Sequence, residues 1–182
     1  GVLAVAGSSG NAVRFFNTNG SDTSSKAEIA LTDAHGALWD PEYDVLWVLG
    51  STHLWALDVT LNADGTITVV KNNSLSVEMP MDHGHDLQPY YGHNDKLLIT
   101  GETMKIYNKN TKEFTDVLDQ RSTKAFCVLP NGDFIYMFPD GLHEQWNTTY
   151  VNILDAETGE ITKIESNQGR FYKCRVWNYN YQ

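Results

Sequence analysis

The sequence has few basic residues and no long apolar run, and each shortage argues against a class of protein. Thirteen Lys and Arg stand against 23 Asp and Glu, which gives a net charge of −10. Because nucleic-acid binding draws on clustered basic residues, we expect no DNA or RNA partner. No apolar run approaches the roughly 18 residues that span a bilayer, so we expect no membrane span. The first ten residues, GVLAVAGSSG, lack the basic start of a signal peptide, so we expect that any export signal was removed or never existed.

Cysteine is also scarce. Cys127 and Cys174 are separated by 47 positions and have no CxxC or CxxH neighbours, so neither a zinc site nor a redox motif is indicated. Free cysteines are commonly buried. We therefore expect two separate buried thiols, with one disulfide as the alternative in an oxidising compartment.

The chain is rich in short apolar strands and poor in helical periodicity. Its hydrophobic content is 41% and its aromatic content 12%, which indicates a folded protein with a sizeable core. β-Branched and aromatic runs bounded by Gly, Asn, Asp and Pro recur throughout, which predicts an all-β fold. Three hairpin segments align on a glycine: VLAVAGSSGNAVRFFN at Gly7, VLWVLGSTHLWALD at Gly50 and KLLITGETMKIYNK at Gly101.

A short strand precedes two of these hairpins and recurs twice more, each time after a histidine or lysine. These leading residues are His35, His85, Lys124 and Lys173, spaced 50, 39 and 49 residues apart. The spacing fits the roughly 40 to 50 residues of a four-stranded propeller blade. We predict one β-propeller domain, or part of one, with about four blades. The repeats span approximately 1–33, 34–80, 81–121 and 122–168, followed by a closing inner strand at 169–178. Either this last strand completes the first blade, or the chain is the later part of a longer propeller.

In a propeller the residue before each innermost strand lies at the mouth of the central channel, which we call the funnel. His35, His85, Lys124 and Lys173 are therefore predicted to converge on it, where they could carry protons or bind an anion. The alternative is that each one hydrogen-bonds a neighbouring blade. Two equivalent lysines would repel unless water or an anion lay between them. Arg175 is expected on the same face of the last strand as Lys173.

Two further features bear on the site. His83 and His85 form a His-x-His pair beside Asp82 and Asp86, and with His35 they could hold a divalent metal if the pair lies on a strand; no cofactor is otherwise indicated. The long segment FPDGLHEQWNTTY, 138–150, offers His143, Glu144 and Trp146 as a sugar-stacking or acid/base edge; the alternative is an ordinary exposed loop. The tryptophans Trp39, Trp47 and Trp55 are expected in the core.

The stretches DAHGALWDPEYDVLWVLG, GHDLQP, EQW with YVNILD, and GRFYKCRVW resemble a family of uncharacterised bacterial β-propeller proteins, a domain of unknown function. The resemblance implies export to the periplasm or cell exterior, with a lipid anchor in the full-length protein as one alternative. It also implies a propeller of about six blades, of which this chain is the later four. The family's leading His and Lys map onto His35, His85, Lys124 and Lys173. Gln145 and Trp146 stand where a commoner family motif has two tryptophans. The layout is more distantly similar to oligogalacturonate lyases.

These observations favour a ligand-binding propeller whose funnel receives an acidic small molecule or acidic glycan. The ligand-binding residues are predicted as His35, His85, Lys124, Lys173, Arg175 and Trp146. One alternative is a polysaccharide lyase, in which a Lys or His abstracts a proton beside a uronate carboxylate, with or without a metal. Another is a platform for protein interactions. The sequence leaves the oligomeric state open.

Overall fold

Antiparallel strands dominate the computed structural model, which describes residues 1–141 and 146–177. The strands are β1 (Val2–Gly7), β2 (Ala12–Asn17), β3 (Ala27–Ala30), β4 (Gly36–Asp40), β5 (Val45–Leu49), β6 (His53–Leu61), β7 (Ile67–Glu78), β8 (Asp86–Tyr90), β9 (His93–Thr100), β10 (Met104–Asn108), β11 (Glu113–Leu118), β12 (Ala125–Val128), β13 (Phe134–Met137), β14 (Tyr150–Leu154) and β15 (Ile161–Glu165). A short 3-10 turn, η1 (Ser8–Gly10), joins β1 to β2. In the described ranges, no helix has the length and hydropathy to cross a membrane.

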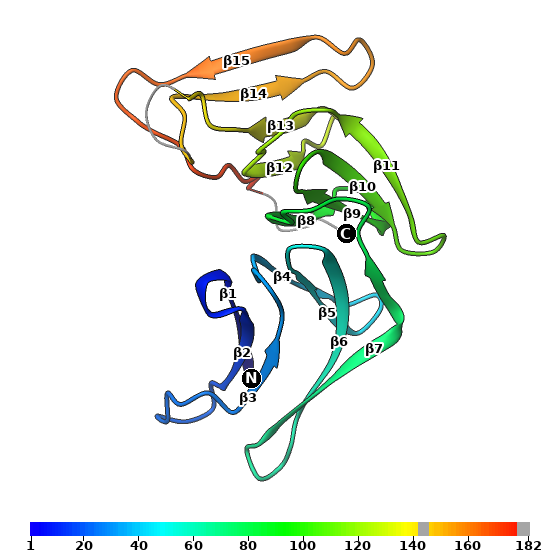
Figure 1. Cartoon of the computed structure of the whole chain (residues 1–182), viewed down its shortest axis with the longest axis vertical. Coiled ribbons are helices and arrows are strands. Elements are labelled where there is room, and N and C mark those ends of the chain that lie inside the picture. The colour runs from blue at the N-terminus through cyan, green and yellow to red at the C-terminus, as the bar shows by residue number, and fades with distance from the viewer. Residues whose placement is uncertain (142–145, 178–182) are drawn as a thin grey trace. The chain divides into compact units, whose positions relative to one another are not determined.

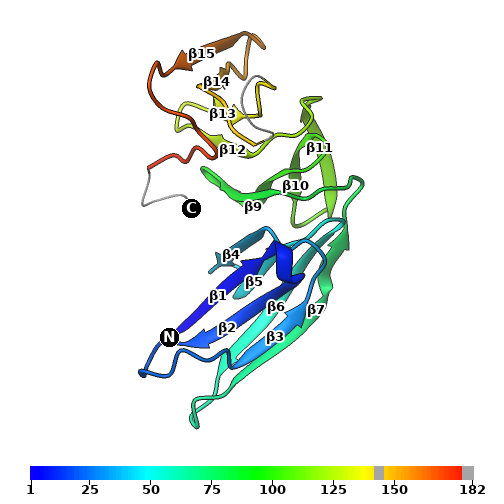
Figure 2. The ribbon, with the colours of Figure 1, turned by 60° about the vertical axis from the view of Figure 1, so that its left-hand side comes forward.

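The strands form four successive antiparallel sheets. The sheets contain β1–β3, β4–β7, β8–β11 and β12–β15, and within each sheet every strand pairs with the next one along the chain. Figures 1 and 2 show these sheets as separate up-and-down meanders. Sequential four-stranded meanders are the blades of a β-propeller, so the predicted all-β propeller class is confirmed. The first sheet has three strands, because β1 aligns with the second strand of the other sheets.

The chain divides into two compact units, Gly1–Gly84 and His85–Gln182. Each unit holds two sheets with an apolar core. The core of the first unit contains Val13, Phe15, Leu31, Ala34, Leu46, Val48, Leu57 and Ile67. The core of the second unit contains Leu98, Met104, Phe126, Val128, Phe134, Tyr136 and Leu154. The four sheets fall within the predicted repeats 1–33, 34–80, 81–121 and 122–168, while the expectation of a single domain stays a prediction.

Three of the four leading residues occupy the same backbone position. The N–H of His35 donates to the carbonyl of Leu49 at 2.8 Å. The N–H of His85 likewise donates to Thr100, and that of Lys124 to Met137, both also at 2.8 Å. In each case the acceptor ends the second strand of the blade. The repeat alignment therefore identifies equivalent structural positions for these three residues, and not only a sequence similarity.

All three predicted hairpins are present. Gly7 is the last residue of the first strand of its hairpin, and Gly50 and Gly101 directly follow the first strand of theirs. At Gly50 the packing of neighbouring groups explains the glycine. Its φ angle is not positive, but an added Cβ would lie 2.6 Å from a methyl carbon of Leu31 and 2.7 Å from the carbonyl oxygen of Thr32. Space, rather than backbone conformation, therefore requires glycine there.

The three tryptophans differ in burial. Trp47 on β5 is fully buried, and its Nε1 donates to Asp40 Oδ2 at 2.8 Å. Trp55 on β6 is half-buried. Trp39 on β4 is 49% exposed, so its assignment to the core is wrong. It lines a partly open apolar cavity of about 450 Å³ together with residues of β1, β2, β5 and β6.

The C-terminal segment, residues 171–177, differs from the other leading strands. Phe171 forms an isolated bridge with Thr148, and residues 172–177 form no strand. Residue 178 of the predicted closing strand, 169–178, lies outside the described residues. The segment is held instead by side-chain contacts, which define the site below.

Candidate functional site

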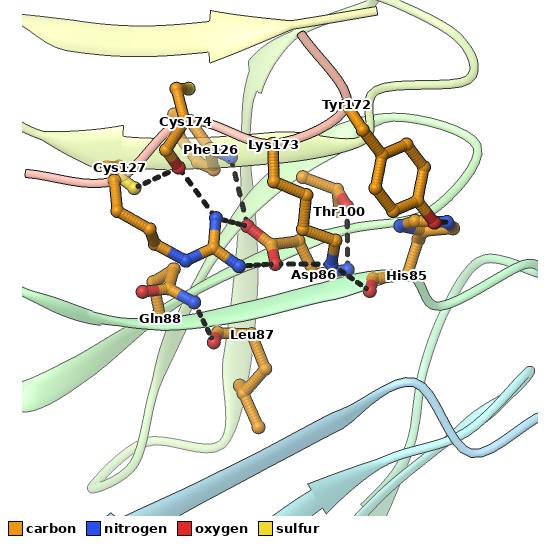
Figure 3. A network of polar contacts seen from close by, with 11 residues as sticks. His85, Asp86, Leu87, Gln88, Thr100, Phe126, Cys127, Tyr172, Lys173 and Cys174 are labelled. Atoms are coloured by element: carbon orange, nitrogen blue, oxygen red, sulfur yellow. Dashed lines mark hydrogen bonds and ion pairs between the residues drawn. The ribbon is translucent and has the colours of Figure 1, made fainter. Parts of the chain in front are cut away.

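The site is built around the carboxylate of Asp86, the first residue of β8. Its backbone N–H donates to Thr100 Oγ1 at 2.9 Å, which fixes the start of β8 against β9. Its carboxylate is 3% exposed and accepts the backbone N–H of Phe126, on β12, at 3.2 Å. A charge this deeply buried must be paired and hydrogen-bonded. Figure 3 shows the groups that converge on it.

Two cations from the C-terminal segment pair with this carboxylate. Lys173 Nζ lies 2.9 Å from Asp86 Oδ1 and 3.4 Å from the carbonyl oxygen of His85. Arg175 binds both carboxylate oxygens, at 2.6 Å to Oδ1 and 3.1 Å to Oδ2. Its guanidinium also donates to the carbonyl of Cys174 at 2.7 Å. Both side chains reach Asp86, but the strand that was expected to place them on one face is not formed over residues 172–177. The bidentate geometry orients the guanidinium.

An aromatic hydroxyl and an imidazole flank the ion pairs. The Tyr172 hydroxyl lies 3.2 Å from His85 Nε2, and the two rings meet edge to face with centroids 5.9 Å apart. His85 is buried, whereas the Tyr172 side chain reaches solvent. The cluster therefore presents a hydroxyl and two cationic groups around one buried carboxylate. We call His85, Asp86, Tyr172, Lys173 and Arg175 the Asp86 cluster.

The charges shift the pKa of two members of the cluster. Burial alone would lower the pKa of the Arg175 guanidinium, but the charge and hydrogen bonds of Asp86 outweigh it and raise the pKa above its ordinary value. Burial, followed by the charge of Asp86, raises the pKa of the Tyr172 phenol. Arg175 is therefore cationic and Tyr172 neutral at physiological pH. The Lys173 and Arg175 side chains remain 26% and 41% exposed, so both cations are accessible to a ligand.

The structure brings three predicted ligand-binding residues together: His85, Lys173 and Arg175. His35 lies in the first unit, where its Nδ1 is 3.0 Å from the carbonyl oxygen of Asp33 and 3.2 Å from its carboxylate. Lys124 is half-buried directly before β12. The convergence of all four leading residues on one funnel stays a prediction.

The remaining predicted residues lie elsewhere. Trp146 is 53% exposed, and its proposed companions His143 and Glu144 fall outside the described residues. The strand geometry assumed for the His-x-His pair is wrong, because His83 precedes β8 and has a left-handed backbone with φ of 60°. Within residues 1–141 and 146–177, no group of three or more His, Cys, Asp or Glu side chains is placed to hold a metal ion.

Sequence reasoning undervalued Asp86, which it considered only as a metal ligand. A signal was present in the repeat alignment. The residue after each leading position is Gly36, Asp86, Ala125 or Cys174, so Asp86 is the one charged residue among small ones. The expectation that water or an anion lies between the two leading lysines did not point to Asp86, which is the anion paired with Lys173.

Comparisons with known proteins give a structural likeness and no family. No protein-family model matches the chain, and no curated protein matches it. The solved structure described as the N-terminal domain of Nup159 is similar at 14% sequence identity, with a TM-score of 0.48. The match covers 93% of this chain and 41% of that one, so the chain spans less than half the length of that structure.

Proposed function

We propose that the chain is a ligand-binding β-propeller that binds an acidic small molecule or acidic glycan at the Asp86 cluster. The observation that carries the proposal is that two cations, Lys173 and Arg175, share one carboxylate. One unit of positive charge is left over in a protein whose net charge is −10. Such a local exception attracts anions.

The donor set suits a carboxylate ligand. A guanidinium has five N–H donors and an ammonium three. The contacts with Asp86 and neighbouring carbonyls do not use all of the donors of these two partly exposed side chains. The Tyr172 hydroxyl adds a neutral donor suited to a sugar hydroxyl. A ligand carboxylate would approach the exposed faces of Lys173 and Arg175, with Asp86 holding both side chains in position.

The test is a thermal-shift titration of the full chain with trigalacturonic acid, and with neutral trigalactose as the control ligand. We expect a stabilising shift with the acidic sugar alone. Lys173→Met should reduce its affinity about tenfold, as loss of one charged hydrogen bond predicts, whereas Lys173→Arg should retain binding. Arg170→Gln is the matched control, because Arg170 is an exposed cation directly before the C-terminal segment. Equal shifts with Lys173→Met and the parent chain would refute the proposal.

The lyase alternative is tested on the same chain and variants by an assay for cleavage. Incubation with polygalacturonate, with and without Mn²⁺ or Ca²⁺, would release unsaturated uronate products with strong ultraviolet absorbance if the chain cleaves by β-elimination. Absence of product together with a binding shift supports the non-catalytic function. Absence of both, with thermal shifts unchanged by every variant, favours the interaction platform.

Export, and a propeller of about six blades of which this chain is the later four, are part of the same proposal. Their support is the resemblance of the HGALW, HDLQP and FYKCRVW stretches to exported bacterial propellers of about six blades. An acidic polysaccharide outside the cell is a ligand consistent with that location. Intact-mass measurement of the natural protein would show whether further blades precede this chain.

A further inference from the structure

Two cysteines that are distant in sequence lie side by side next to the Asp86 cluster. Cys127 lies on β12, and its Sγ is 3.5 Å from the carbonyl oxygen of Cys174 (Figure 3). Standard backbone geometry then places this sulfur within about 6 Å of the Cys174 Cα. Both thiols are free. Disulfides join residues whose Cα atoms are about 4.4–6.8 Å apart. Bridging therefore needs the two side chains to turn toward each other and segment 171–177 to shift locally.

Contacts on both sides hold Cys174 in this position. Before it, Thr148 and Phe171 exchange backbone hydrogen bonds of 3.1 and 2.7 Å. After it, Arg175 binds the Asp86 carboxylate through two nitrogens. Because residues 172–177 form no strand of their own, the segment between these anchors can adjust locally. The two cysteines are thus held close without a rigid backbone between the anchors.

We propose that Cys127 and Cys174 form an intramolecular disulfide when the protein meets a low-molecular-weight disulfide such as oxidised glutathione. The Cys174 thiol loses its proton to solvent, and its thiolate attacks the oxidant, forming a mixed disulfide and releasing one glutathione thiolate. The Cys127 thiol then loses its proton to solvent, and its thiolate attacks the Cys174 sulfur, expelling the second glutathione thiolate. Two protein thiols are oxidised and one oxidant disulfide is reduced to two thiols.

The bridge would tie the C-terminal segment covalently to β12.

Burial, followed by the charge of Asp86, raises the pKa of Cys127 to about 11. Burial, followed by the neighbouring Cys127, raises the pKa of Cys174 to about 12. Since thiolates are the attacking species, oxidation should be slow at neutral pH. It should accelerate about tenfold per pH unit while the attacking thiol stays below its pKa.

The test treats the full, reduced chain with oxidised glutathione between pH 7 and pH 9. We expect intact mass spectrometry to show loss of two hydrogens. A non-reducing tryptic digest should join peptide 125–163 to the dipeptide Cys174-Arg175. The midpoint of thermal unfolding should rise by roughly 5–10 °C, and a reductant should reverse the change.

Two single variants separate the bridge from other thiol chemistry. Cys174→Ser and Cys127→Ala should each form no internal bridge and show no rise in the unfolding midpoint. Two retained thiols at saturating oxidant would overturn the proposal. So would separate glutathione adducts on both cysteines, or a bridge between two chains. This outcome is independent of the acidic-ligand titration, because the ligand is absent throughout.

Discussion

Asp86 occupies a position where the other repeats have small residues, Gly36, Ala125 and Cys174. A carboxylate that is 3% exposed is tolerated only because cations and N–H donors surround it. These donors come from β12 and from a segment nearly ninety residues further along the chain. The single side chain of Asp86 therefore connects three pieces of the second unit.

Asp86→Asn tests this role, because the amide keeps the size of the side chain and removes its charge. Lys173 and Arg175 would remain partly buried without a counter-ion. We expect the free energy of unfolding to fall by about 3 kcal/mol, measured by guanidinium chloride denaturation. Glu157→Gln is the control, since Glu157 is an exposed acid of the same unit, and should change it by less than about 0.5 kcal/mol. Equal stabilities for Asp86→Asn and the parent chain would show that the carboxylate is dispensable.

At the scale of the strands, the sequence predicted the hairpins, which depend on local residue pattern. It failed to predict the exposure of a side chain, which depends on what packs against the strand. The hairpins at Gly7, Gly50 and Gly101 follow from turn chemistry and alternating apolar residues, and all are present. Trp39 has the spacing of a core residue yet is 49% exposed. Periodicity predicts which face of a strand a residue lies on, but it does not predict what packs against that face.

The candidate site shows the same division. The repeat alignment identified His85 and Lys173 from their leading positions in the sequence, although residues 172–177 form no strand. It did not predict that Lys173 and Arg175 would pair with Asp86, since that contact depends on how β8, β12 and residues 171–177 pack. Side-chain partners across sheets leave no periodic signal in a single sequence.

Gly84 provides a prediction at the scale of elements, in the loop before β8. Its N–H donates to the carbonyl of Ser51 at 2.9 Å, and an added Cβ would lie 2.2 Å from the carbonyl oxygen of Gly50. Gly84→Ala must therefore displace backbone, and we expect a loss of about 3 kcal/mol in the free energy of unfolding. Gly20→Ala is the matched control, because nothing lies within 4 Å of its added Cβ. Similar urea midpoints for the two variants would contradict the close packing at Gly84.

The molecule as a whole combines repeated sheets with two compact units, Gly1–Gly84 and His85–Gln182. Each unit has its own buried cluster, drawn from two sheets. Repeat proteins often distribute stability among neighbouring modules rather than in one cooperative core. The Asp86 cluster and both cysteines belong entirely to the second unit, so the stability of that unit governs the proposed binding and the proposed bridge.

Paired core truncations test whether the units open independently. Leu57 and Leu98 are both fully buried, one in each core, and replacing either by alanine should cost about 2–5 kcal/mol. If each core stabilises its own unit, Leu57→Ala should accelerate amide hydrogen exchange in β1–β7 and leave β8–β15 protected, while Leu98→Ala should do the reverse. Hydrogen-exchange mass spectrometry resolves the two patterns, each variant serving as the control for the other. Accelerated exchange across both units in either variant would instead mean that the propeller sheets unfold as one cooperative structure, because destabilising one core would then open the other.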